Sequence, residues 1–457
     1  MNSAGSDSSR VDETPPIVDG SGDNSSNPLG LLSATTLVAA SMIGAGVYTT
    51  SGFTIGDLGS PWLVLLAWLI GGVIAICGAV CYGALAGEFT ESGGEYLFLS
   101  RALHPVAGLM AGWVSLLAGF TGAIAFAATA FASYLFPDSP SWTSIAAISL
   151  VVLAAALHTI GVRPGARVQD AAVLLKLTLI AAFVVMALLT TDGWQGTKGV
   201  SSAGVKESTS AFSFALTFAT SLMWISLSYS GFNAAVYVAG EVKQPERNVP
   251  RALLMGTLLV TVIYIVLNAI FVLAPSIESI RFQPDVATLA ARSIGGAKFE
   301  LFIRVVILFG LFTSVSALVM TGPRVYAKMA DDGFLPRVFR FQGQVPIVAI
   351  WIQAVLAMLV ISVSTLKQLL GYLGFTLSVS AALTVGLVFW LHCRESSKVR
   401  VPWFPIPPII FVGGTLLTAT LAAIATPAQA VAGLITIGFG LLYYPWYRMR
   451  SKKSDLH

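Results

Sequence analysis

The chain has 457 residues, of which 56% are hydrophobic and only 11% are charged. Soluble proteins carry roughly 25% charged residues, so these charges are too few to cover a water-facing surface. Nucleic-acid binding, a disulfide-rich secreted scaffold and an ordinary soluble enzyme are therefore poor interpretations, and the lipid bilayer is the expected solvent.

Residues 1–28 are rich in serine and acidic residues and hold almost no large apolar side chain. We expect a disordered cytoplasmic tail here. The segment lacks the basic start and short apolar core of a secretory signal, so the first apolar run is expected to remain as a membrane span. Residues 448–457 form a short basic tail, also expected in the cytoplasm.

Between these tails, apolar runs recur that are long enough to cross the hydrocarbon layer as helices of about 20 residues. Lipid requires each span to satisfy its own backbone hydrogen bonds, so helices are favoured over a barrel. We predict an all-α integral membrane protein. Its twelve spans are expected near residues 30–54, 61–87, 106–135, 143–160, 168–190, 212–240, 251–274, 300–330, 345–364, 368–391, 405–425 and 428–446.

Lys and Arg residues in the connections predict the orientation, because cytoplasmic loops carry the excess. With the amino terminus inside, eighteen of them fall on the cytoplasmic side and six on the outer side. We therefore expect a multi-pass protein of the plasma membrane, the inner membrane if the source is bacterial, with both termini in the cytoplasm.

The first span has Gly44 and Gly46 at its centre. If the helix unwinds there, peptide groups are freed at membrane depth, where only protein, a ligand or a water-filled cavity can satisfy them. The alternative is a small-residue face used for helix packing, which is the commoner role of membrane glycine.

The sixth span carries a second interruption, from Tyr229 through Ser230 and Gly231 to Asn233. Two interrupted helices five helices apart fit two inverted five-helix repeats, with a substrate held where the broken helices meet. We expect the first repeat at residues 29–191, the second at residues 192–391 and two added helices at residues 392–447.

Lys176 lies in the fifth span, about nine residues and so roughly 13 Å beyond Arg167 at helical rise. Charged residues inside spans usually face a polar interior. Two roles are open: exchange of protons, or an ammonium held permanently where another transporter binds sodium. The alternative is a lysine whose ammonium reaches back to the cytoplasmic interface.

Asp and Glu are missing from the middle of the predicted spans. A cationic side chain on a substrate would find no carboxylate partner, which favours neutral substrates. Amides at the start of the second half of the first helix could hold an α-carboxylate, and carbonyls of the unwound stretches could hold an α-ammonium.

Five segments in order resemble the amino acid, polyamine and organocation permeases, over about residues 28–340. They are Met42 to Tyr48, Glu88 to Tyr96, Val168 to Asp170 together with Lys176, Tyr229 to Asn233 together with Gly240 to Arg251, and Gly322 to Pro336. The resemblance implies the five-plus-five inverted-repeat fold of the leucine transporter with two extra helices, and transport by alternating access.

The resemblance also implies roles for single residues. The substrate carboxylate would meet Ile43, Gly44, Ala45 and Gly46, and the rest of the pocket would come from Leu227, Tyr229, Ser230, Gly231 and Phe232. Lys176 matches a lysine that occupies a sodium position in proton-coupled relatives, and Ser316 matches a polar position near it.

Two residues depart from the pattern of these permeases. Leu227 stands where many relatives carry an aromatic gate, so Trp224 or Phe232 would have to close the site instead. Asp331 replaces a basic residue usual at that place, which leaves its pairing open.

We therefore predict a secondary transporter, not an enzyme, that moves small neutral amino acids and is driven by protons or by amino acid exchange. No cofactor, metal or nucleic-acid partner is expected, and a single-chain carrier is the default because no outer-loop cysteine suggests linkage to a second subunit. Rival interpretations are a polyamine or cationic amino acid carrier, an intramembrane enzyme, and an amino acid sensor that does not transport.

Overall fold

The computed structural model describes residues 29–137, 139–160, 166–190, 194, 210–341, 345–395 and 397–454. The tail predicted at residues 1–28 and residues 455–457 of the basic tail lie outside this part. Within it, the chain folds into helices: α1 Leu31–Met42, α2 Ala45–Leu58, α3 Pro61–Glu88, α4 Gly94–Ala102, α5 Pro105–Val114, the π-helix η1 Ser115–Gly122, α6 Ala123–Leu135, α7 Pro140–Thr159, α8 Ala166–Leu188, α9 Ala211–Tyr229, the 3₁₀-helix η4 Ala234–Glu241, α10 Pro245–Leu273, α11 Ile277–Ile280, α12 Val286–Asp331, the 3₁₀-helix η5 Arg337–Phe339, α13 Ile347–Val363, α14 Leu366–His392, α15 Ile406–Ala425 and α16 Pro427–Ser454.

The predicted spans correspond to helices in this arrangement. Among the described residues, eleven helical segments are long and apolar enough to cross a membrane, and Ile347–Val363 is a shorter apolar helix. Each of the twelve predicted ranges overlaps one of them, which confirms an all-α membrane protein. The division into repeats at residue 191 stays a prediction.

The sixth span extends over Ala211–Glu241, close to the predicted range. It is interrupted where the sequence predicted: α9 ends at Tyr229, and an irregular turn leads to η4. The boundary predicted near residue 300 was wrong, because α12 begins at Val286 and is kinked at Gly295 and Gly296, where the backbone leaves helical angles. Both irregularities occur at glycines, which lower helix propensity and admit positive φ.

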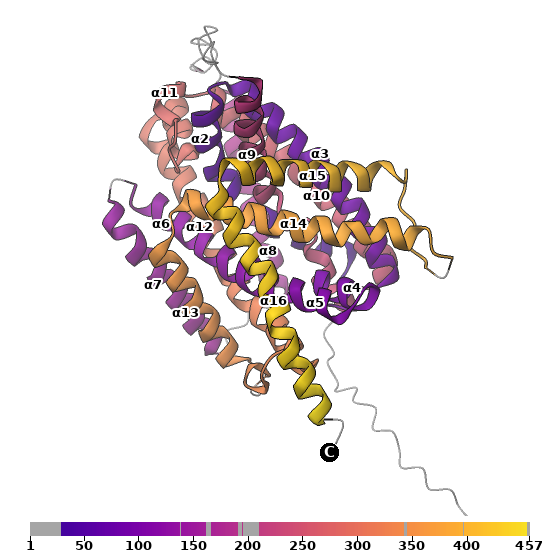
Figure 1. Cartoon of the computed structure of the whole chain (residues 1–457). Helices are drawn as coiled ribbons and strands as arrows, with labels where there is room; N and C mark the ends of the chain where they lie inside the picture. The colour runs from indigo at the N-terminus through magenta and orange to yellow at the C-terminus, as the bar shows by residue number, and fades with distance from the viewer. Residues whose placement is uncertain are drawn as a thin grey trace, which may run out of the picture.

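Two long helices, α3 and α10, pack against the broken ones. α3 and α10 pack along each other, α1 packs against α10, and α2 packs against α9. On one side α14 and α15 lie next to each other, and α16 crosses α14 on its way to the C-terminal end (Figure 1). The buried centre is therefore built around α3 and α10, with both interrupted spans against it.

Candidate functional site

A cavity of about 1190 Å³ lies between the two interrupted spans. Its wall includes residues from both interruptions and from α3, η1, α8, α12 and α14. Glu91 and Gly240 line the cavity and are exposed, so its open end lies on the side of the bundle where η4 ends and where Leu29, just before α1, bonds to Glu241. The cavity is thus open on one side and reaches to the middle of the bundle.

The first interruption separates α1 from α2 at Ile43 and Gly44. Ile43 has a ψ of 82° and Gly44 is extended, so the helical ladder stops and restarts at Ala45. No side chain caps the start of α2. The first amides of a helix have no partner inside it and form the positive end of its dipole. An uncapped helix start therefore faces the cavity, where Ala45 and Gly46 line the wall.

The second interruption touches the first. Gly231 has a φ of 99°, and a Cβ added there would lie 2.7 Å from the Ser41 carbonyl oxygen. A Cβ added at Gly46 would lie 2.7 Å from the Ser228 Cα. The glycines therefore let the two broken segments meet backbone to backbone, so close packing and unwinding, which the sequence left as alternatives, occur together.

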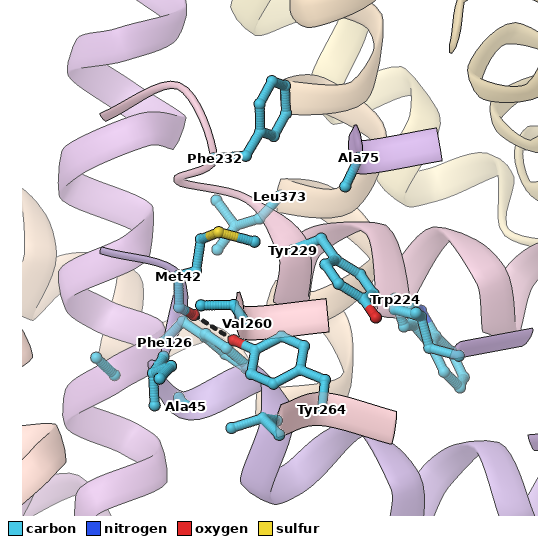
Figure 2. Packing of buried hydrophobic residues seen from close by; sticks show 14 of the residues in the cluster. Met42, Ala45, Ala75, Phe126, Trp224, Tyr229, Phe232, Val260, Tyr264 and Leu373 are labelled. Atoms are coloured by element: carbon cyan, nitrogen blue, oxygen red, sulfur yellow. Dashed lines mark hydrogen bonds between the residues drawn. The ribbon is translucent and has the colours of Figure 1, made fainter. Parts of the chain in front are cut away.

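Two side chains hold carbonyl groups that the first interruption frees. The Lys176 Nζ donates to the Ile43 carbonyl, and the stem of Lys176 runs 3.7 Å from where a Cβ on Gly310 would be. The Tyr264 hydroxyl donates to the Met42 carbonyl, as the dashed line in Figure 2 shows, and lies 3.0 Å from the Ser228 carbonyl. Tyr264 thus stands between the two broken helices and can bond to either.

The predicted site residues mostly gather on the cavity wall. Gly44, Ala45, Gly46, Leu227, Tyr229, Ser230, Gly231, Phe232 and Lys176 line it. Ile43 is buried and takes part through its carbonyl, which accepts from Lys176. The lysine lies inside the bundle with 4% of its surface exposed, so the interpretation in which its ammonium reaches back to the membrane interface was wrong.

Ser316, which the resemblance groups with Lys176, does not line the cavity beside it. Its hydroxyl is 2.9 Å from the His158 Nε2 on α7. Thr313 and Ser314 line the cavity instead. Because an α-helix turns by about 100° per residue, Ser314 and Ser316 point about 200° apart and cannot share a face.

Contacts with neighbouring helices hold the two aromatic residues of the second interruption, Tyr229 and Phe232, in place. The Tyr229 hydroxyl donates to the Trp68 carbonyl at 3.1 Å. The Phe232 ring contacts Tyr82 and Phe411 with centroid distances of 5.3 and 5.9 Å. In Figure 2, Phe232 and Trp224 lie on opposite sides of Tyr229.

Trp224 lies toward the end of the bundle away from the cavity mouth. Its buried ring contacts Phe53 at 6.3 Å, and the Lys367 ammonium lies 5.0 Å from its centroid. Lys367 is also 3.9 Å from Asp57. Trp224 lines a smaller pocket of about 350 Å³ with these two charged residues. Trp224 therefore lies outside the lining of the large cavity, while Phe232 lies in its wall, and the closure of the site by either residue stays a prediction.

Sequence reasoning missed Glu95. This carboxylate comes from α4, in a connection between spans, yet it is 7% exposed and lines the cavity. The Ser380 hydroxyl donates to it at 2.7 Å and the Asn233 amide at 3.2 Å. The expectation that no carboxylate is available to the site was therefore wrong, because it considered only residues inside spans.

The pairing of Asp331 is also visible. Its carboxylate lies 3.1 Å from the Arg340 Nε, and the Arg340 side chain also donates to the Ala330 carbonyl. A basic residue nine positions later thus contacts the acidic residue that departs from the permease pattern.

A comparison with known protein families agrees with this architecture. The family described as amino acid permease matches residues 29–444 of the chain. The chain belongs to the amino acid permease family. This confirms the resemblance seen in the five segments, and with it the leucine-transporter type of fold with about twelve spans.

Individual relatives of this permease are amino acid transporters. It is 27% identical to the serine/threonine exchanger SteT of Bacillus subtilis, over 93% of this chain and 98% of that protein. It is 26% identical to the mouse b(0,+)-type amino acid transporter 1, over 91% of this chain and 87% of the relative. The human large neutral amino acids transporter small subunit 2 is 27% identical over 76% of this chain and 66% of its own length.

Proposed function

We propose that this permease carries small neutral amino acids across the plasma membrane by alternating access, driven by protons or by exchange for another amino acid. The observation that carries the proposal is the meeting of the two interruptions, Gly231 against Ser41, at the wall of one cavity. A helix start and a helix end face the same space there. A zwitterion presents the two charges that complement those ends.

The substrate carboxylate binds the uncapped amides at the start of α2, from Ala45 to Val47. The ammonium binds carbonyls at the end of α9, near Leu227 and Ser230. The side chain of the substrate lies toward apolar groups of the wall, including Phe126, Leu373 and Phe232. Such a wall favours a small uncharged side chain, because a buried unpaired charge is costly.

The state described is open toward the cytoplasm. The cavity mouth lies at the end of the bundle that the distribution of Lys and Arg predicts to be inside, and Trp224 closes the other end. The amino and carboxyl termini then both lie in the cytoplasm. Lys176 serves as a fixed ammonium that holds the Ile43 carbonyl, in the manner of the sodium that other transporters bind.

Uptake by purified protein in liposomes tests the proposal. We expect liposomes loaded with unlabelled alanine to take up labelled alanine, and small neutral amino acids such as serine and threonine to compete. Lysine and putrescine should not compete at the same concentration, because Glu95 already accepts bonds from three neutral donors.

Competition by lysine or putrescine equal to that by serine would instead support the rival class of cationic substrates. Binding of alanine without flux would indicate a sensor. Either result would contradict the proposed transport of neutral amino acids.

A further inference from the structure

Glu95 is held in a fully neutral environment. Its carboxylate accepts from the Tyr82 hydroxyl on α3, the Ser380 hydroxyl on α14 and the Asn233 amide after the second interruption. Tyr237 of η4 is a further titratable residue nearby, and the charge of the Glu95 carboxylate acts on its hydroxyl. Among the residues that the structure describes, no lysine, arginine or histidine forms an ion pair with Glu95.

The backbone before Glu95 explains how a loop residue enters the wall. Gly93 and Gly94 have φ values of 153° and 60°, and a Cβ on Gly94 would lie 2.3 Å from the Tyr237 ring. Only glycine permits this approach of α4 to η4. The pair therefore brings the next side chain, Glu95, between α3, η4 and α14.

These surroundings act on the Glu95 carboxyl in two opposite directions. Three donors stabilise the carboxylate, but burial without a cation disfavours it. Burial is the larger effect and raises the pKa of Glu95 above its usual value. The residue also lines the open cavity, so water in the cavity can deliver or remove a proton.

Protonation of Glu95 would reach the moving part of the site through Asn233. Asn233 lies two residues beyond Gly231, and its amide donates to the Glu95 Oε1. A carboxylate binds this donor more strongly than a neutral acid, because charge-assisted hydrogen bonds are the stronger ones. Uptake of a proton therefore weakens the bond that ties the segment after the second interruption to α3 and α14. Any such difference between states biases the transport equilibrium.

We propose that Glu95 is the binding site of the proton that drives this permease. The proposal rests on the proposed function and deepens it by naming protons, taken up by Glu95 instead of Lys176, as the coupling ion. In the state described, the Glu95 carboxylate takes up a proton from water in the cavity, and the neutral acid releases it to the same water. In the opposite state, the same carboxyl exchanges with water admitted on the Trp224 side.

Gradient-driven accumulation of alanine in liposomes tests Glu95. With one proton per substrate, an inward gradient of one pH unit drives about tenfold accumulation, because one unit corresponds to a tenfold ratio. We expect this from the wild type. Glu95→Gln keeps an acceptor for Tyr82 but cannot ionise, so its accumulation ratio should fall to about one. Exchange of labelled for unlabelled alanine, which needs no net proton movement, should remain measurable.

Glu246→Gln is the matched control, since Glu246 is exposed on α10 and does not line the cavity. It should accumulate alanine like the wild type. If Glu95→Gln does not fold, Glu95→Asp decides: a shorter acid must move the pH of half-maximal uptake, and an unchanged pH profile overturns the proposal.

Two further results would overturn the role of Glu95. One is accumulation by Glu95→Gln equal to that of the wild type. The other is a wild type that exchanges alanine but does not accumulate it in response to the pH gradient. That result would leave the proposed amino acid transport standing and would rule out protons as the coupling ion. A wild type that moves no amino acid at all would overturn the proposed function itself.

Discussion

Replacing Gly231 by alanine should lower alanine uptake at least tenfold. Gly231 adopts a φ of 99°, which costs a residue with a side chain about 1–2 kcal/mol. The new methyl group would also lie 2.7 Å from the Ser41 carbonyl oxygen, which belongs to the backbone and cannot turn aside. The two interruptions would be pushed apart at the substrate site. Initial rates of labelled alanine uptake in liposomes, at equal amounts of folded protein, measure the effect.

Gly413→Ala is the control for this experiment. Gly413 lies on α15 with open space around the position of an added Cβ, so the same chemical change should leave uptake near the wild-type rate. Equal rates for Gly231→Ala and Gly413→Ala would mean that the contact between the interruptions does not matter for transport.

Lys176→Met should also reduce uptake strongly, by roughly tenfold or more. Methionine keeps most of the stem but removes the ammonium that donates to the Ile43 carbonyl. A buried group that loses its partner costs about 1–3 kcal/mol. The first interruption would then lose one of the two donors that hold its carbonyls, Tyr264 being the other. Concentration dependence of alanine exchange in liposomes would report the loss.

The remaining uptake of Lys176→Met separates the two roles open to this lysine. If Lys176 is a fixed ammonium and Glu95 takes the proton, the residual uptake keeps the wild-type response to pH. A response that disappears in Lys176→Met but survives in Glu95→Gln would assign the proton to Lys176. Leu175→Met, at a side chain that is 49% exposed on the same helix, should behave as wild type.

Much of the site could be predicted because its signals are local. Gly44 and Gly231 stand out as weak helix formers inside apolar spans, and their spacing of five helices has a geometric meaning. Lys176 stands out because a charge inside a span needs a polar partner, which is the Ile43 carbonyl. In each case the residue type is unfavourable inside an apolar membrane helix, and this indicates a functional role.

Other parts of the site depend on tertiary packing, which leaves no such signal. Glu95 lies in a connection where charge is ordinary, and only the docking of α4 on Tyr237 makes it buried. Tyr264 is an unremarkable aromatic residue of an apolar span until α10 carries it between the interruptions. Ser316 could not be told from Ser314 because a span with polar residues on several faces does not reveal which face is inside. The double glycine before Glu95 was the one available hint.

The most direct measurement is an experimental structure of this permease with alanine bound. We expect alanine between the two interruptions, with its carboxylate at the amides of Ala45 to Val47 and its ammonium near the end of α9. Alanine bound elsewhere in the bundle, or continuous helices through Gly44 and Gly231, would contradict this expectation.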